Sequence, residues 1–352
     1  MKTILIKVDS ENPSAEALLP AAEILKKGGT VVFPTETVYG LGGDATHSES
    51  AEKIYAAKGR PSDNPLIIHI SNPDEVEPYA VTSKLWYRLA RHFMPGPLTV
   101  ILPKKDSIPS TVTGGLDSVA VRCPAHPVAL KLLELTGLPV AAPSANISGK
   151  PSPTCAEHVI EDLDGRVDCI IDGGECTFGV ESTIVKITGE DSLVLLRPGA
   201  VTYDALCCVC SDVTVSDTVL NKLKENERPI CPGSKYRHYA PDKPLTLVGG
   251  SDEARLCFFA ERQKEGAVII CYDEQAEHLP ADQVITIGKK DDLEAQGHRL
   301  FAALRECNSL EGKCVFANLP STDGFGLALY NRLIRAAAHT VIHVTDKNTI
   351  HH

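Results

Sequence analysis

FPTETVYGLG, residues 33–42, follows a short β-branched run and precedes a helix-like segment. A simple strand-to-helix turn needs only two or three polar residues and a glycine. This stretch instead carries two threonines, a glutamate and a tyrosine, and it leads into three closely spaced glycines, Gly40, Gly42 and Gly43. Glycine permits backbone conformations that other residues avoid, and loops often carry binding residues. We therefore interpret the stretch as a loop that holds a small polar ligand.

Strand-like and helix-like runs alternate along the chain up to about residue 209. Short apolar or β-branched runs predict strands, and apolar residues spaced three to four apart predict helices. This alternation is typical of an α/β fold with a twisted, partly parallel sheet. Strands are expected in ILIKV (4–8), TVVF (30–33), LIIHI (66–70), LTVIL (98–102), SVAVR (118–122), LPVAA (138–142), CIID (169–172), STIVKIT (182–188) and LVLL (193–196), and helices over 15–27, 48–58, 83–93, 126–136 and 154–162.

Residues 211–244 interrupt this pattern. They are rich in proline in their second half and contain no long strand-like run, so we predict a linker. The linker is unusual in having the consecutive sequence KYRHY at residues 235–239. From LTLVGG (245–250) the alternation resumes and predicts a smaller Rossmann-like domain. The expected organisation is a first domain over 1–210, a linker over 211–244 and a second domain over 245–352.

Composition and charge limit the classes of function. With 43% hydrophobic and 23% charged residues, the chain of 352 residues should form ordinary globular domains. No run approaches the roughly 18 apolar residues of a membrane span, and MKTILIKVDS reaches charged residues too early for a signal peptide. We expect a cytoplasmic protein without membrane association. The net charge of -11 argues against a broad surface for stable nucleic-acid binding.

The chain contains 12 cysteines, most of them alone within apolar runs. There they are expected to behave as small buried hydrophobic residues. Cys207, Cys208 and Cys210 form the one cluster, but no Cys or His pair follows at the spacing of a zinc finger. We favour simple thiols, with a metal site as the alternative, and expect no metal ligands among the protein side chains.

The glycine pattern does not predict a nucleotide cofactor. Gly40, Gly42 and Ala45 fit the dinucleotide fingerprint, but the first glycine lies seven residues after Phe33, the expected strand end. The fingerprint needs glycine directly after the strand, so that the pyrophosphate meets the helix start. No glycine-rich run ends in the Lys-Ser or Lys-Thr of a P-loop. No organic cofactor is therefore expected.

The segment YAAKGRPSDNPLIIHI places Lys58 and Arg60 just beyond an expected helix end. Cations at this position often only compensate the helix dipole. Here Gly59 frees the turn and Pro61 restricts the chain after it, so the two cations are also suited to bind a triphosphate. His69 lies on the following strand, where a structural role is the more common explanation.

Other short polar residues occur at strand ends, where open α/β sheets bind ligands. LPVAAPSANISGKPSPT places Ser144 and Asn146 after an apolar strand, although a simple Asx or Ser turn would also explain them. GLDSVAVRCP ends a strand with Arg122, and GVESTIVKI begins one with Ser182.

Seven ordered motifs together resemble the YrdC-domain threonylcarbamoyl-AMP synthases. They are FPTETVYGLG, KGRPSDNPLIIHI, MPGPLTVIL, AVRCPAHP, APSANISGKPSPT, GVESTIV and LLRPG. The resemblance covers residues 10–209 almost continuously. KYRHYAP and the α/β tail are similar to the longer, two-domain branch, which implies a YrdC-like mixed sheet followed by a Rossmann-like domain.

The resemblance implies an enzyme that makes threonylcarbamoyl-AMP and pyrophosphate from L-threonine, bicarbonate and ATP, with Mg²⁺ accompanying ATP. A downstream tRNA threonylcarbamoyltransferase would use the product. The family signature falls on Lys58, Arg60, Ser144 and Asn146. The implied threonine contacts are Thr35, Ile67, His69, Arg122, Ala142 and Ser182; the implied ATP contacts are Lys58, Arg60, Ser62, Ser118, Ser144, Ser152, Arg197 and Tyr236.

This chemistry agrees with the absence of a recognisable nucleophile or triad in the sequence. The reaction brings anions together, so cations and oriented donors matter more than a covalent residue. KYRHYAP, through Tyr236, would fold over the site as a lid; an ordered strap is the alternative. Two other functions stay open: a non-enzymatic RNA-binding or translation factor, and a carbamoyl-adenylate-forming module.

Overall fold

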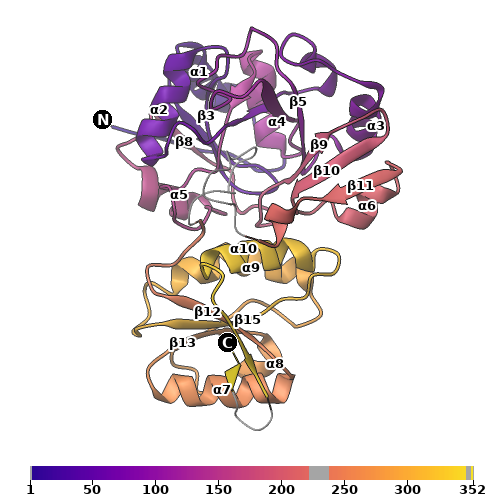
Figure 1. Ribbon diagram of the computed structural model, residues 1–352. Helices are drawn as coiled ribbons and strands as arrows, with labels where there is room; N and C mark the ends of the chain where they lie inside the picture. The colour runs from indigo at the N-terminus through magenta and orange to yellow at the C-terminus, as the bar shows by residue number, and fades with distance from the viewer. Residues whose placement is uncertain (1, 222–237, 346–349, 352) are drawn as a thin grey trace. The chain divides into compact units, whose positions relative to one another are not determined.

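The structure, a computed structural model, describes residues 2–221, 238–345 and 350–351. Contacts divide the chain into two compact units, each an α/β structure with its own sheet (Figure 1). The expected α/β fold class is confirmed. The first unit comprises Met1–Ser148 and Ser152–Lys235, and the second comprises Gly149–Pro151 and Tyr236–His352.

The first unit is built on a mixed sheet with the strand order β1-β8-β2-β3-β7-β4-β6-β5-β9-β10-β11. The sheet contains both parallel and antiparallel strand pairs, which agrees with the prediction of a partly parallel sheet. The strands are β1 (Ile4–Lys7), β2 (Val31–Phe33), β3 (Gly40–Asp44), β4 (Ile67–His69), β5 (Leu98–Pro103), β6 (Ser118–Arg122), β7 (Val140–Ala141), β8 (Cys169–Asp172), β9 (Thr183–Ile187), β10 (Ser192–Arg197) and β11 (Asp212–Val215).

The helices of the first unit begin and end at residues suited to those positions. Ser14 caps the start of α1 by accepting from the Ala17 N–H, and Gly137 ends α4 in the left-handed conformation. The helices are α1 (Ala15–Lys26), α2 (Ser48–Lys58), α3 (Lys84–Phe93), α4 (Pro127–Thr136), α5 (Ala156–Leu163) and α6 (Tyr203–Cys207), with 3₁₀ turns η1 (Pro73–Val76) and η2 (Asp217–Val219).

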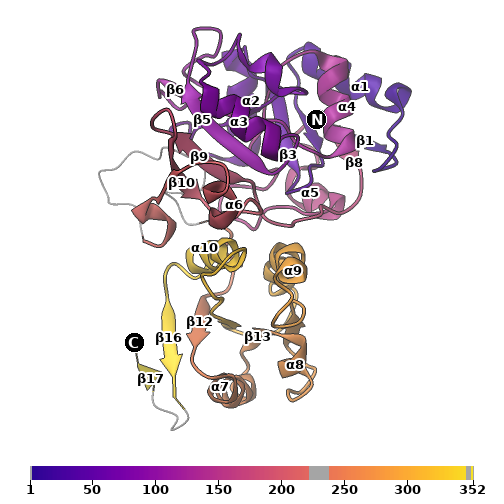
Figure 2. The same ribbon diagram turned by 90° about the vertical axis from the view of Figure 1, so that its right-hand side faces the viewer.

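Helices α1 and α4 pack against each other and against one part of the sheet (Figure 2). Their apolar residues form a core with side chains of β2, β7 and β8. Burial of these side chains is the main stabilising term for this half of the unit. A second, smaller apolar cluster lies further along the sheet, on β4, β5, β6, β9 and β10. It consists of Ile67, Ile101, Ala120, Ile184 and Leu196.

The placement of the glycines after FPTETVY in the predicted loop is wrong, whereas the ligand-holding role of the stretch stays a prediction. These glycines lie in β3, which pairs antiparallel with β2 and β7. A Cβ added to Gly42 would come within 2.8 Å of Phe33 and 2.7 Å of Val140, both buried. Close packing, and not backbone freedom, therefore requires glycine at this position. The irregular segment is only 34–39, between β2 and β3.

The second unit has a six-stranded sheet with the order β14-β13-β15-β12-β16-β17. All pairs are parallel except β16 with β17. Helices α7 and α8 cover one face, and α9 and α10 cover the other (Figure 1). The elements are β12 (Leu245–Gly249), α7 (Asp252–Lys264), β13 (Val268–Cys271), α8 (Asp273–Ala276), β14 (Val284–Thr286), α9 (Leu293–Glu306), β15 (Val315–Asn318), α10 (Gly326–Ala336), β16 (Val341–Val344) and β17 (Ile350–His351).

The range predicted as a linker, 211–244, is described only at its beginning and its end. Its beginning includes β11, which pairs in parallel with β10 of the first unit. Tyr236, like the rest of 222–237, lies outside the described residues. Within the second unit, Tyr239 is buried with its ring 5.1 Å from that of Phe301 and 5.9 Å from the guanidinium of Arg332. The predicted domain boundaries stay a prediction.

Candidate active site

The candidate site in the first unit is based on a row of residues across the sheet. His69 on β4 is paired in register with Arg122 on β6, Arg122 with Thr99 on β5, Thr99 with Ile184 on β9, and Ile184 with Arg197 on β10. Residues paired across strands point to the same face. The fold therefore gathers three predicted residues, His69, Arg122 and Arg197, on one face of the sheet beside the smaller apolar cluster.

Arg122 is fixed by a residue that the sequence analysis did not single out. Its Nη2 lies 2.6 Å from Oε1 of Glu36, and its Nε donates to the Gly96 carbonyl at 3.4 Å. The other carboxylate oxygen of Glu36 accepts from the Ala125 N–H at 3.1 Å. Both charged side chains are almost fully buried, with 5% of Arg122 and 7% of Glu36 exposed. Arg122, an implied threonine contact, is thus part of a buried ion pair.

His69 is neutral in this environment. Burial, and then the positive charge of Arg122, lower the pKa of His69 to about 3. The ring Nδ1 lies 3.3 Å from the Val140 carbonyl oxygen, which can only accept a hydrogen bond. We infer that Nδ1 carries the proton, which makes Nε2 an acceptor. Such an acceptor suits an ammonium or hydroxyl group of a ligand.

Ser182 and Arg197 belong to one hydrogen-bond network with Thr99, a second residue that the sequence analysis missed. The hydroxyls of Ser182 and Thr99 lie 2.7 Å apart. Arg197 donates from Nη2 to the Ser182 hydroxyl at 3.2 Å and from Nε to the Ser182 carbonyl at 3.0 Å. Ser182, a predicted threonine contact, and Arg197, a predicted ATP contact, are therefore directly hydrogen-bonded to each other.

The signature residues Lys58, Ser144 and Asn146 form one cluster. Lys58 is only 1% exposed, and its Nζ donates to the carbonyls of Ser144 and Asn146, each at 2.5 Å. The Ser144 hydroxyl donates to Oδ1 of Asn146 at 2.6 Å, and Nδ2 of Asn146 donates to the Ile147 carbonyl at 2.8 Å. Lys58 thereby holds the loop after β7 in shape as well as placing a positive charge beneath it.

Arg60 contacts a different loop from Lys58. Gly59 ends α2 with φ of 59°, a left-handed conformation that glycine adopts at little cost, and the chain turns there. Arg60 then donates from Nη2 to the carbonyls of Asn64 at 3.2 Å and Pro65 at 3.0 Å. Lys58 and Arg60 thus donate to carbonyls of two different loops, and their joint binding of a triphosphate stays a prediction.

Four other predicted residues make local hydrogen bonds outside the two groups described above. Thr35 is buried and uses its hydroxyl within its own turn, donating to the Val38 carbonyl at 2.7 Å. The Ala142 N–H donates to the Ile67 carbonyl at 2.8 Å, so these two backbone groups satisfy each other. Ser152 donates to Oε1 of buried Glu181 at 2.5 Å.

The two remaining serines in the described range lie away from the row. Ser62 is exposed on the loop after α2. Ser118 begins β6, at the opposite end of that strand from Arg122. The parallel pairing of β4 with β6 places this end beside the beginning of β4. Ser118 is therefore nearer to the Arg60 loop than to His69 and Arg122.

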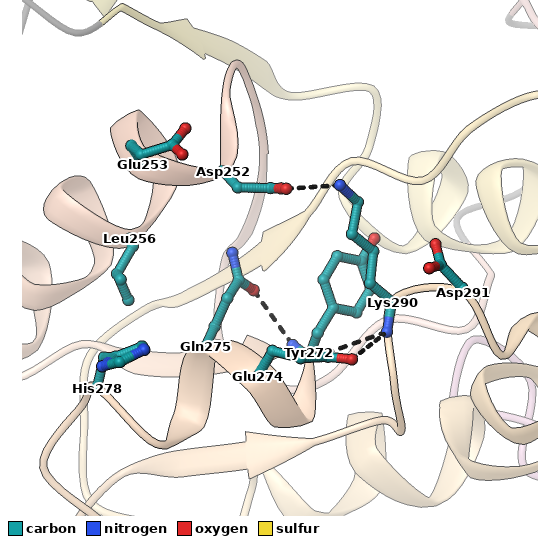
Figure 3. A pocket seen from close by; sticks show the side chains of 9 residues that line it. All are labelled: Asp252, Glu253, Leu256, Tyr272, Glu274, Gln275, His278, Lys290 and Asp291. Carbon is teal, nitrogen blue, oxygen red and sulfur yellow. Dashed lines mark hydrogen bonds and ion pairs between the residues drawn. The ribbon is translucent and has the colours of Figure 1, made fainter.

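The second unit has a pocket of about 350 Å³ lined by residues of α7, α8 and the loop before α9 (Figure 3). It lies near the carboxyl end of β13, where open α/β sheets often bind ligands. Its charged groups are largely paired with one another: Lys290 Nζ lies 2.5 Å from Asp252, and the Lys290 N–H donates to Glu274 at 3.2 Å. This pairing makes it a weaker candidate than the row in the first unit.

No three His, Cys, Asp or Glu side chains in the described part of the chain lie close enough together to hold a metal ion. None of the helices described is both long and apolar enough to cross a membrane.

Comparisons with known proteins identify the family. Residues 23–199 match a family model described as telomere recombination (Sua5, YciO and YrdC), and residues 201–338 match one described as the threonylcarbamoyl-AMP synthase C-terminal domain. The chain is 44% identical to a threonylcarbamoyl-AMP synthase of Bacillus subtilis (strain 168) over 329 residues, and the matched region covers 92% of this chain and 93% of that protein. It is also 44% identical to a threonylcarbamoyl-AMP synthase of Pyrococcus abyssi over 332 residues, which cover 92% of this chain and 95% of that protein.

Structure comparison leads to the same result. The crystal structure of P. abyssi Sua5 complexed with L-threonine matches with a TM-score of 0.90 and 42% identity, covering 97% of this chain and 100% of that one. The fold and these relatives thus define a two-domain α/β enzyme of the nucleotidyltransferase type. The chain belongs to the threonylcarbamoyl-AMP synthase family. The family resemblance and the enzyme class predicted from the sequence are confirmed.

Proposed function

We propose that the first unit condenses L-threonine, bicarbonate and ATP into threonylcarbamoyl-AMP and pyrophosphate, with the row on the sheet binding threonine. The observation that carries this assignment is the in-register placement of His69, Arg122 and Thr99 on adjacent strands. It supports an amino-acid site because it combines a cation for the carboxylate with an uncharged acceptor for the amine or hydroxyl.

In the threonine half of the site, Arg122 binds the carboxylate. Nε2 of His69 accepts from the amine or the hydroxyl, and the Ser182 and Thr35 hydroxyls complete the polar contacts. The backbone near Ile67 and Ala142 forms the adjacent wall. The apolar cluster on the same face would contact the threonine methyl group, which serine lacks, and one buried methyl contributes about 1 kcal/mol.

In the ATP half, Lys58 and the loop that it holds present Ser144 and Asn146 to the nucleotide, and Arg60 stabilises phosphate charge. The positive charge of Lys58 acts on the nucleotide through the loop, because its Nζ donates hydrogen bonds to two loop carbonyls. We assign further nucleotide contacts to Ser62, Ser118, Ser152, Arg197 and Tyr236, the last of which lies outside the described residues.

The chemistry begins when the threonine amine and bicarbonate form a carbamate and release water. A carbamate carboxylate oxygen then attacks the α-phosphorus of ATP, and the bond from that phosphorus to the bridging oxygen of the β-phosphate breaks to release pyrophosphate. Positioning and charge stabilisation account for such a step without a covalent intermediate. Mg²⁺ enters as part of the ATP substrate, since triphosphate oxygens supply the hard ligands that it requires.

The same proposal places the enzyme in the cytoplasm and gives its product to a downstream tRNA threonylcarbamoyltransferase. An adenylate of this kind is labile, so transfer to a second enzyme is its expected fate. The net charge of -11 favours delivery through that enzyme over stable binding of tRNA by this chain.

The direct test measures pyrophosphate release from ATP by the full chain, with threonine or bicarbonate omitted in turn. Release should require both. Equal release without threonine would show that the row does not bind an amino acid that takes part in the reaction.

A further inference from the structure

The structure contains a buried carboxylate, Glu36, in the half of the site proposed for threonine. Its Oε1 lies 2.6 Å from Nη2 of Arg122, and its Oε2 accepts from the Ala125 N–H at 3.1 Å. The Gly96 carbonyl accepts from Nε. These contacts occupy the Nε–Nη2 edge of the guanidinium, and Nη1 makes no hydrogen bond within the described part of the chain. A ligand carboxylate therefore has Nη1 and the second N–H of Nη2 to approach.

The proposed reaction makes selectivity at Arg122 necessary. Threonine, bicarbonate and the triphosphate all carry negative charge, and a buried arginine without a counterion would bind whichever anion arrived first. His69 is neutral and adds no charge to this part of the row. Glu36 is thus the group that balances Arg122, and their pair has no net charge.

We propose that Glu36 is a specificity-determining positioning residue that prevents bicarbonate and other small anions from occupying the threonine-carboxylate position at Arg122. Because the pair is neutral, a small anion gains little from Arg122 alone. Threonine binds because its amine, hydroxyl and methyl group make further contacts with the row and the apolar cluster. Glu36 also fixes the guanidinium plane, so that Nη1 is presented in one orientation. This inference rests on the proposed function.

The test compares the wild type with Glu36→Gln, which retains the size of the side chain and one acceptor oxygen but removes the charge. The matched control is Asp168→Asn, which removes a carboxylate that accepts from Thr30, outside the row in the same unit. The KM for threonine and the KM for ATP are measured with and without inorganic phosphate at constant ionic strength. A competing anion at ten times its Kd raises the KM about tenfold.

In Glu36→Gln, phosphate should raise the KM for threonine about tenfold, and high bicarbonate should inhibit in competition with threonine. The KM for ATP should change much less. The wild type and Asp168→Asn should show neither effect. A KM for threonine in Glu36→Gln that does not respond to phosphate or bicarbonate would overturn the proposal.

A second measurement needs no activity and so separates this inference from the proposed function. Through saturable binding, phosphate should raise the Tm of Glu36→Gln by about 3 °C more than it raises the Tm of the wild type or Asp168→Asn. Replacing Arg122 as well, in Glu36→Gln/Arg122→Gln, should abolish this extra increase. If the extra increase persists in the double variant, the anion binds elsewhere and the role of Glu36 is refuted. If phosphate stabilises Glu36→Gln through Arg122 but no threonine-dependent product forms, the proposed function fails and the anion selectivity stands.

Discussion

Lys58→Met should destabilise the first unit by about 2–4 kcal/mol. The substitution keeps an unbranched side chain but removes an ammonium group that is bonded at 2.5 Å to each of two loop carbonyls, Ser144 and Asn146. A hydrogen bond to a charged group contributes about 1.5–3 kcal/mol, so the two together contribute about 3–6 kcal/mol. Burial of the methionine side chain at the same site recovers about 1 kcal/mol at the low end of this range and about 2 kcal/mol at the high end, which leaves a net loss of about 2–4 kcal/mol.

The chain offers a specific probe for this measurement. Trp86 is the single tryptophan and is fully buried on α3, so its fluorescence reports unfolding of the first unit alone. For a unit of this size, the expected loss corresponds to a decrease in Tm of about 5–15 °C. Turnover at a temperature where the variant is folded should fall about 100-fold or more, because the loop that carries Ser144 and Asn146 loses its support.

Lys53→Met is the matched control, since Lys53 lies on the same helix with its ammonium exposed and bonded to one surface carbonyl, that of Gly28, at 2.7 Å. We expect a change in stability of less than about 0.5 kcal/mol. The reasoning is refuted if Lys58→Met melts within experimental error of the wild type, or if Lys53→Met loses as much stability as Lys58→Met.

Three further predictions concern neighbouring residues. The native pKa of His69 is about 3 and the unfolded value is near 6.5, so the native state binds fewer protons between these values. The stability that His69 contributes above pH 6.5 is therefore lost as the pH falls towards 3, and His69→Asn should reduce the fall in unfolding free energy between pH 7 and 5 by about 2 kcal/mol. Equal falls in the variant and the wild type, measured by urea unfolding, would contradict this. Thr99→Val removes the hydroxyl that lies 2.7 Å from that of Ser182 and should raise the KM for threonine about fivefold; an unchanged KM would exclude Thr99 from positioning Ser182. Arg60→Ala should lower turnover about 100-fold in a protein whose Trp86 fluorescence remains native, whereas near-normal turnover would leave Arg60 as a loop-binding residue only.

Much of the first unit could be predicted from its sequence because the apolar periodicity is strong. All five predicted helices and all nine predicted strands of this unit correspond to elements of the structure. Strand β3 was missed because Gly40, Leu41, Gly42 and Gly43 lack the β-branched residues that signal a strand. The reason for these glycines, close contact of Gly42 with Phe33 and Val140, depends on residues distant in sequence.

The site was predicted in its residues more than in its contacts. Glu36 was visible between two threonines of FPTETVYGLG, but its pairing with Arg122 spans 86 positions and follows from the fold alone. Thr99 gives no signal in its strand, and only the register of β5 with β6 places it beside Arg122. The pattern of helix-end cations predicts Lys58 and Arg60 as a pair, but not that they donate to carbonyls of two different loops on either side of the left-handed turn at Gly59; this follows from the fold.

The measurement that tests the central claim most directly is mass spectrometry of the product formed from ATP, L-threonine and ¹³C-labelled bicarbonate. If the first unit joins the carbamate of threonine to the α-phosphorus, the adenylate product contains threonine and one labelled carbon, and its mass increases by one unit relative to unlabelled bicarbonate. Formation of threonyl-AMP without the labelled carbon, or of AMP alone when both co-substrates are present, would contradict the account.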